Sequence, residues 1–239
     1  MAELLALHNV TAGYRDTVVL ESVSATIATQ ESWAVLGRNG VGKTTLLMTI
    51  MGLTAMRGGR ITLDGQEITT LATHRRARAG IGYVPQEREI FPSLTVDENL
   101  RVATTPGEWN RARVYDLFPR LAERRRNYGN QLSGGEQQML AVGRALVGNP
   151  KVLLLDEPFE GLAPVIIDTL AEALTRLRRE SNIATALVEQ QVDVTLELTE
   201  HAMVLDKGQI VWRGTSADLA SDRERLASLV GLQEATTAR

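Results

Sequence analysis

The residue types best suited to chemistry in this chain form a glycine-rich segment that contains one lysine and two threonines. Glycine lets successive backbone N–H groups turn toward a phosphate. A lysine can then place its charge on the β and γ phosphates of a nucleotide, and a threonine hydroxyl can bind Mg²⁺. We therefore predict a nucleotide-binding loop; the alternative is a glycine-rich turn with an incidental lysine. The segment consists of Gly37, Arg38, Asn39, Gly40, Val41, Gly42, Lys43, Thr44 and Thr45.

Two carboxylates follow an apolar run that is typical of a buried strand. Asp156 and Glu157 come directly after Val152–Leu155. In open α/β sheets, ligands bind at the carboxyl ends of such strands. Asp156 can hold Mg²⁺, and Glu157 is predicted to be the general base that activates water. The alternative is a polar boundary between strand and loop, and the glycine-rich loop in the same chain argues against it.

A third segment, Leu132–Glu136, opens a predicted helix with the sequence Leu-Ser-Gly-Gly-Glu. Ser133 is a good N-cap, and Gly134 and Gly135 leave backbone N–H groups unobstructed. The start of this helix is therefore a second anion-binding surface. The chain has two surfaces for a γ-phosphate but one complete nucleotide site. A capped helix with glycines for tight packing is the alternative interpretation.

Together these segments resemble those of the ATP-binding subunits of ABC transporters, over nearly the whole chain. The resemblance implies an α/β fold: a P-loop NTPase core, an antiparallel β subdomain and a helical insertion that carries Leu132–Glu136. It also implies that Ser133, Gly134 and Gly135 close on the ATP of a partner subunit. Two ATP molecules would then lie between two subunits.

The resemblance assigns roles to two further residues. Gln86 follows a predicted strand, Ile81–Pro85, and its family counterpart reaches the Mg²⁺ and the attacking water. The adjoining segment, with Ile90 and Phe91 expected to be exposed, would contact a membrane subunit, although packing in the core is an equal alternative for each. Tyr14 matches the aromatic residue that stacks on adenine; the alternative is a buried tyrosine beside a turn.

Two positions depart from the general family pattern. Gln190 follows the predicted strand end where most of these ATPases have a histidine that senses the γ-phosphate. Glutamine can donate a hydrogen bond through its amide, but it cannot carry a positive charge. Ala163 replaces the usual aspartate in the loop after Glu157. Glu157, Gln86 and Gln190 are our catalytic candidates, and both departures bear on whether the site is fully hydrolytic.

Four segments of the sequence resemble those of one ATPase subunit of branched-chain amino-acid importers. The resemblance implies an ATPase that uses ATP and Mg²⁺, a second ATPase subunit that is different from this one, and transmembrane permease subunits. Alternatives are a soluble ABC ATPase of metal-cluster assembly, an ABC-fold translation factor, urea or amide uptake, and lipid export. The segments that carry the resemblance are Ile90–Val96, Leu132–Gln138, Glu157–Pro164 and Val188–Gln190.

Composition sets limits on partners and location. The 239 residues are 44% hydrophobic and 23% charged, with a net charge of −3, and this balance does not suggest a nucleic-acid partner. The absence of cysteine excludes disulfides and catalytic thiols. The N-terminus lacks the features of a signal peptide, and no apolar run approaches the ~20 residues that span a bilayer. We expect a cytoplasmic protein that reaches the inner face of the plasma membrane through its partners.

The elements that position these residues follow from hydrophobic patterning and from capping residues. We predict that residues 1–239 form one ABC ATPase domain, with a helical part from about 87 to 147. Thr95 and Glu98 form a capping-box pattern at the start of one helix. The other predicted elements are short strands at 5–10, 18–20, 23–27, 33–36 and 60–63, a helix at 44–51, strands at 152–155 and 183–188, a hairpin at 202–212 and a final helix at 216–230.

Overall fold

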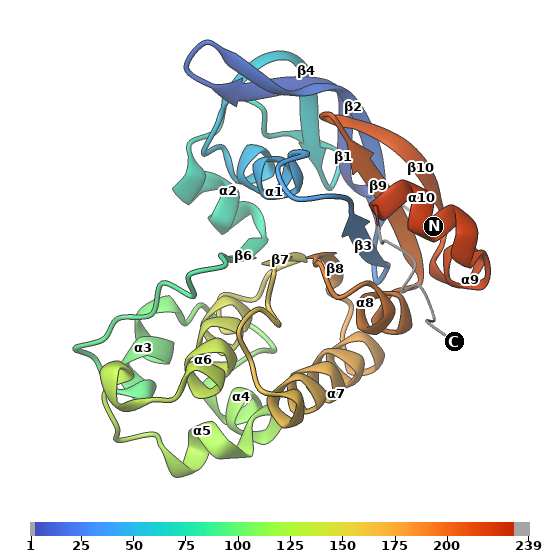
Figure 1. Cartoon of the computed structure of the whole chain (residues 1–239). Helices are drawn as coiled ribbons and strands as arrows, with labels where there is room; N and C mark the ends of the chain where they lie inside the picture. Colours follow the sequence, from blue (N-terminus) through green and yellow to red (C-terminus); the bar gives the residue numbers. More distant parts are fainter. Residues whose placement is uncertain (1–2, 232–239) are drawn as a thin grey trace, which may run out of the picture.

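The computed structural model describes residues 3–231, which fold around two β-sheets (Figure 1). One sheet is antiparallel, in the order β2-β1-β4-β5, and the other has the order β10-β9-β3-β8-β7-β6. The strands are β1 Glu3–Tyr14, β2 Thr17–Ala28, β3 Ser32–Leu36, β4 Ala55–Leu63, β5 Gln66–Glu67, β6 Ile81–Val84, β7 Val152–Asp156, β8 Ala184–Val188, β9 His201–Asp206 and β10 Gln209–Thr215.

Helices cover the six-stranded sheet and fill the connections between strands. The helices are α1 Lys43–Met51, α2 Thr73–Ala79, α3 Val96–Ala103, α4 Arg111–Leu117, α5 Pro119–Glu123, the 3₁₀ helix η1 Gly129–Gln131, α6 Gly134–Leu146, α7 Pro164–Glu180, α8 Val192–Leu198, α9 Ser216–Ser221 and α10 Arg223–Val230. Within residues 3–231, none of these helices has both the length and the apolar character that a membrane crossing requires.

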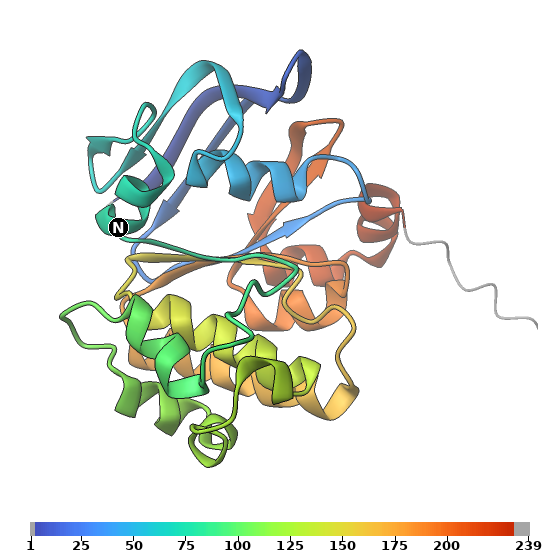
Figure 2. The ribbon, with the colours of Figure 1, turned by 90° about the vertical axis from the view of Figure 1, so that its left-hand side faces the viewer.

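Strands β6, β7, β8, β3 and β9 run parallel, and β10 pairs antiparallel with β9. The apolar run of β7 is buried on both faces, as predicted. Val152 and Leu154 join the core that includes α1 and the antiparallel sheet, whereas Leu153 and Leu155 join the core that includes α6 and α7. Figure 2 shows these two layers on opposite sides of the sheet. The carboxyl ends of the parallel strands therefore meet along one edge.

The antiparallel sheet is built from longer strands than the sequence predicted. Strands β1 and β2 pair from Glu3–Ala28 to Tyr14–Thr17, with several shifts of register. Asn9 and Ser22 have positive φ at these irregularities, and β-bulges of this kind bend a strand without ending its pairing. Three short predicted strands are therefore parts of two long ones.

The chain between β6 and β7 is predominantly helical, as predicted, and contains α3 to α6 with η1. The predicted capping box at α3 is confirmed. The Thr95 hydroxyl accepts a hydrogen bond from the backbone N–H of Glu98 at 3.2 Å, and the Glu98 carboxylate accepts one from the N–H of Thr95 at 2.9 Å. These bonds satisfy two N–H groups that the helix itself leaves unpaired.

The predicted hairpin near the end of the chain is confirmed, but the single helix predicted at 216–230 is wrong. The chain forms α9 and α10, with a break at Asp222, whose φ of −106° and ψ of 80° are not helical. The Asp222 carboxylate accepts a hydrogen bond from the N–H of Arg225 at 3.0 Å. Aspartate is a preferred N-cap, so this residue starts a new helix inside an apolar pattern that looks continuous.

Candidate nucleotide site

The glycine-rich loop connects β3 to α1 at the carboxyl edge of the six-stranded sheet. Gly42 is the N-cap of α1 with a φ of 110°. Gly37 has a φ of 144°, and a β-carbon there would lie 2.3 Å from the carbonyl oxygen of Leu205. The loop therefore requires glycine at these positions, and it directs the N–H groups at the start of α1 toward the site.

Lys43 is buried within the loop. Its ammonium group donates to the carbonyl oxygens of Gly37 at 2.9 Å and Arg38 at 3.2 Å. Burial lowers the pKa of Lys43, and the charges of Glu157, Asp156 and Glu189 oppose this effect. The geometry places a positive charge under the loop, which fits the predicted contact with phosphates.

Asp156 ends β7 and is fully buried. Its carboxylate accepts hydrogen bonds from the Thr44 hydroxyl at 3.0 Å and from the Tyr83 hydroxyl at 3.2 Å. Burial raises the pKa of Asp156 to about 6, and the charge of Glu157 adds to the rise. The structure thus brings two of the three predicted Mg²⁺ ligands, Thr44 and Asp156, into direct contact.

These groups fit Mg²⁺ chemically, because they are hard oxygen donors. Within residues 3–231 there is no cluster of three or more histidine, cysteine, aspartate or glutamate side chains that could hold a metal by themselves. Mg²⁺ in nucleotide sites takes only one or two carboxylates and completes its shell with phosphate oxygens and water. The small set of donors around Asp156 matches that mode of binding.

Glu157 has a φ of 46°, in the left-handed backbone region that residues other than glycine rarely adopt. Such a conformation costs about 1–3 kcal/mol and persists where surrounding contacts impose it. Here the N–H of Glu157 donates to the carbonyl oxygen of Val188 at 2.8 Å. Its carboxylate accepts from the Gln190 amide at 2.7 Å, and Gln190 in turn accepts from the Asn39 amide at 3.2 Å. Gln190 therefore joins the predicted base to the nucleotide-binding loop.

A hollow of about 340 Å³ brings most of the predicted residues together. Gln86 lies on its wall and donates to the carboxylate of Glu160. Val19 and Glu160 also line the hollow and were not predicted from the sequence. Neither stands in a recognised motif, and their spacing along the chain gives no signal. The lining residues are Val19, Asn39, Gly40, Gly42, Lys43, Thr44, Thr45, Gln86, Glu157, Glu160 and Gln190.

Tyr14 does not line this hollow. It ends β1 with 41% of its surface exposed, and its hydroxyl contacts the sulfur of Met48 in α1 at 3.2 Å. The alternative of a buried tyrosine is therefore wrong. An exposed aromatic ring beside α1 is compatible with stacking on a base, which stays a prediction.

The Leu132–Glu136 segment is not part of the same hollow. Ser133 is the N-cap of α6, as predicted, and forms a capping box with Glu136. Gly134 is exposed, but a β-carbon on Gly135 would lie 2.6 Å from a side-chain carbon of Ile166 in α7. Tight packing therefore explains Gly135, while Ser133 and Gly134 are exposed and do not line the hollow of their own chain.

The segment after Gln86 differs in part from the prediction. Ile90 is half-buried and packs against the core that includes α6, so its predicted exposure is wrong. Phe91 is exposed, and the Arg144 guanidinium lies 5.0 Å from its ring centre. Ile90 has apolar neighbours within its own chain, whereas Phe91 keeps a free face.

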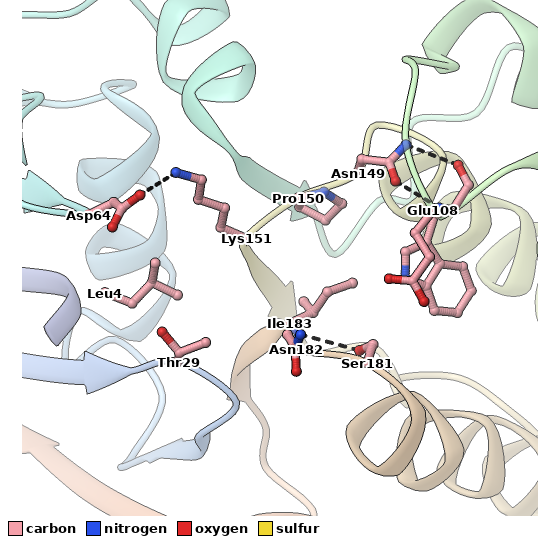
Figure 3. A pocket seen from close by; sticks show the side chains of 11 residues that line it. Leu4, Thr29, Asp64, Glu108, Asn149, Pro150, Lys151, Ser181, Asn182 and Ile183 are labelled. Atoms are coloured by element: carbon pink, nitrogen blue, oxygen red, sulfur yellow. Dashed lines mark hydrogen bonds and ion pairs between the residues drawn. The ribbon is translucent and has the colours of Figure 1, made fainter. Parts of the chain in front are cut away.

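A second hollow, of about 350 Å³, lies at the opposite, amino ends of β7 and β8 (Figure 3). Lys151 pairs there with Asp64, and Asn149 accepts from the N–H of Trp109 at 2.7 Å. The buried indole N–H of Trp109, which also lines this hollow, has no hydrogen-bond partner within the described residues. None of the predicted site residues lines this hollow. We therefore place the candidate site at the carboxyl edge.

Proteins of known sequence indicate the family of this chain. A family model described as ABC transporter matches residues 20–160. The branched-chain amino acid transport ATP-binding protein BraG of Pseudomonas aeruginosa is 41% identical over 224 residues, 92% of this chain and 96% of BraG. The probable branched-chain amino acid transport protein LivF of Archaeoglobus fulgidus is 39% identical, covering 87% and 90%. The lipopolysaccharide export protein LptB of Haemophilus influenzae is 36% identical, covering 92% and 94%.

Solved structures of ABC transporter proteins have the same fold as this chain. The structure of cbiO1 from Clostridium perfringens, part of the ABC transporter complex cbiONQ, superposes with a TM-score of 0.81 at 25% identity and covers 96% of each chain. A bacterial ABC transporter cassette determined as a dimer, MJ0796, superposes with a TM-score of 0.78 at 25% identity, covering 89% of this chain and 99% of that one. This chain therefore belongs to the ABC transporter family, in which it is an ATP-binding, ATP-hydrolysing subunit coupled to transport.

Proposed function

We propose that this subunit energises the import of branched-chain amino acids and works on the cytoplasmic face of the membrane, bound to permease subunits. The observation that carries the proposal is the similarity to BraG and LivF at 41% and 39% identity. The segment Gly161–Pro164 and Gln190 support it from the sequence. Lipid export is the second candidate, because LptB is 36% identical over nearly its whole length.

In this proposal the chain residues divide the work of hydrolysis. Lys43 and the N–H groups at the start of α1 hold the phosphates, and Thr44, Asp156 and Gln86 hold Mg²⁺. Bound Mg²⁺ would neutralise charge on the β and γ phosphate oxygens. Glu157 accepts the proton of the attacking water, and the Gln190 amide, which donates to Glu157 at 2.7 Å, holds that carboxylate in place.

The proposed assembly contains a second, different ATPase subunit. Residues 1–239 would form one ABC ATPase domain, with residues 87–147 as its helical subdomain. Ser133, Gly134 and Gly135 would contact the ATP of the partner, and Tyr14 would stack on the adenine of the ATP held by this chain. Because Gln190 and Ala163 depart from the family pattern, the two ATP sites would differ, which favours a heterodimer over a homodimer. We propose no nucleic-acid partner.

The test uses the assembled transporter, reconstituted with its permease subunits and a substrate-binding protein. Leucine, isoleucine or valine should raise ATP turnover and be transported. Glu157→Gln should lower turnover by at least about 100-fold, because general-base catalysis contributes that much, and should leave ATP binding intact. Gln190→His should keep turnover, because a histidine also offers a hydrogen-bond donor.

The control is Glu172→Gln, which alters an exposed carboxylate on α7 and should change nothing. Near-normal turnover of Glu157→Gln would contradict the assignment of the base. Stimulation by lipopolysaccharide instead of amino acids would replace the first candidate by the second.

A further inference from the structure

Glu189 is a buried carboxylate that none of the roles above uses. It follows β8 directly and is 2% exposed. Within residues 3–231 it forms no ion pair with a basic side chain. Burial raises its pKa, and the nearby charge of Glu157 acts in the same direction. A charged group in such a place needs hydrogen bonds that compensate for lost hydration.

Those hydrogen bonds come from two separate chain segments. One carboxylate oxygen accepts from the N–H of Phe159 at 2.7 Å. The other accepts from the N–H of Gln190 at 3.0 Å and, at 3.5 Å, from that of Gln191. Phe159 belongs to the segment after β7, whereas Gln190 and Gln191 belong to the segment after β8. One carboxylate therefore connects the two segments.

The two connected segments carry the groups that meet at the nucleotide hollow. Asp156 and Val188 are paired at the ends of β7 and β8, and the N–H of Glu157 donates to the carbonyl oxygen of Val188 at 2.8 Å. In addition to that bond, the Glu189 carboxylate accepts hydrogen bonds from the backbone of the segment after β7 and of the segment after β8. The side chains of Glu157 and Gln190 then lie 2.7 Å apart, from carboxylate oxygen to amide nitrogen.

We propose that Glu189 is a positioning residue for ATP hydrolysis: by bonding to both segments it fixes the separation at which Gln190 holds the Glu157 carboxylate. The inference rests on the proposed role of Glu157 as general base. Without Glu189, the pairing of β7 and β8 would still maintain the fold. The orientation of Glu157, whose backbone is left-handed, would no longer be fixed. A displacement of about 1 Å at a reacting group can lower the rate by about 100-fold.

The test is Glu189→Gln in the assembled transporter. Glutamine has the same shape, but its amide offers one acceptor oxygen, so one of the two segments faces an N–H group of the side chain instead. We expect kcat to fall about tenfold or more and the KM for ATP to change less than twofold. In a Glu157→Gln background the same change should cause no further loss, because residues that act as a unit are not additive.

Glu31→Gln is the matched control. Glu31 also accepts from a backbone N–H, that of Ala28 at 2.8 Å, and from the Trp33 indole at 2.8 Å, but it lies at the other end of β3. It should lower the melting temperature and leave kcat unchanged. If Glu189→Gln does not unfold cooperatively, Glu189→Asp replaces it: the shorter side chain keeps the charge but cannot reach both segments, so kcat should fall in the same way.

An unchanged kcat with a lowered melting temperature would overturn the proposal. A rise in the KM for ATP as large as the fall in kcat would also overturn it. These outcomes are distinct from failure of the base assignment, which appears as near-normal turnover of Glu157→Gln alone. Loss of turnover in Glu157→Gln without loss in Glu189→Gln removes the positioning role and leaves the base in place.

Discussion

Asp156 shows that a single residue can be unfavourable for stability and still suit the function. Its carboxylate is fully buried with a pKa of about 6, well above its ordinary value of 3.8. Two hydroxyl donors, from Thr44 and Tyr83, compensate only part of the lost hydration. A cation beside this carboxylate would remove the remaining penalty, which fits the proposed role of Asp156 as a ligand for Mg²⁺.

A prediction follows for the protein without nucleotide or Mg²⁺. Between pH 4 and pH 6 the folded state binds a proton at Asp156 that the unfolded state does not bind, so stability falls as pH rises through this range. Above pH 6 the whole penalty is present, and Asp156→Asn should stabilise the protein by up to about 3 kcal/mol at pH 7.5. Denaturant unfolding at pH 7.5 and pH 5 measures the effect, which should shrink at the lower pH.

Exposed Asp16→Asn serves as the control and should have no effect at either pH. A wild type as stable as Asp156→Asn at pH 7.5 would contradict the account of burial. Mg²⁺ with ATP should stabilise the wild type, and Asp156→Asn should lose this additional stability.

Residue types with a characteristic spacing could be predicted from sequence, and their partners could not. Lys43, Asp156 and Glu157 stand in motifs, so the sequence alone places Lys43 at the start of a helix and the two carboxylates at a strand end. Glu160 and Glu189 act through groups that are far away in sequence, such as Gln86 and the N–H of Phe159. The sequence holds no signal for such contacts until the adjacency of β7 and β8 is known.

At the scale of elements, patterning predicted the buried strands and failed where a local cap overrides it. Apolar runs predicted β7 and β8, and the turn residues before Gln209 predicted the hairpin of β9 and β10. Asp222 interrupts an apolar pattern that reads as one helix, because its carboxylate bonds to the N–H of Arg225. The long β1 and β2 were missed for a similar reason, since bulges shift the alternation of side chains.

The break between α9 and α10 has a measurable consequence. Asp222→Ala should remove the cap of α10 and cost about 1 kcal/mol, which corresponds to roughly 2–4 °C in melting temperature for a chain of this size. The matched control is Asp168→Ala, an exposed aspartate of α7, which should change the melting temperature by less than about 1 °C. Equal shifts for the two variants would mean that the cap contributes nothing.

At the scale of the whole molecule, the two predicted phosphate-binding surfaces do not line the same hollow. The hollow around Lys43 excludes Ser133, and the open start of α6 lies outside it. A solved relative of the same fold is a dimer. Under the proposed function, one chain would hold one ATP and offer the start of α6 to the ATP of its partner.

Counting bound ATP separates the two surfaces. In the assembled transporter, Lys43→Ala should remove the ATP held by this chain, and Ser133→Arg should remove the ATP held by the partner subunit. The double variant should then retain none, as measured by ATP that stays bound after rapid desalting. Ser228→Arg, at an exposed position of α10, is the control and should retain both. One ATP retained by the double variant would contradict the assignment of Ser133 to the ATP of the partner subunit.

The left-handed backbone at Glu157 has a consequence for which residues suit this position. Its φ of 46° is unfavourable for glutamate and natural for glycine, and asparagine tolerates it better. Either replacement would relieve this backbone strain, at the cost of the hydrogen bond that the Glu157 carboxylate accepts from the Gln190 amide. Under the proposed function, the backbone strain at this position therefore opposes the general base, and only its part in turnover would favour glutamate here.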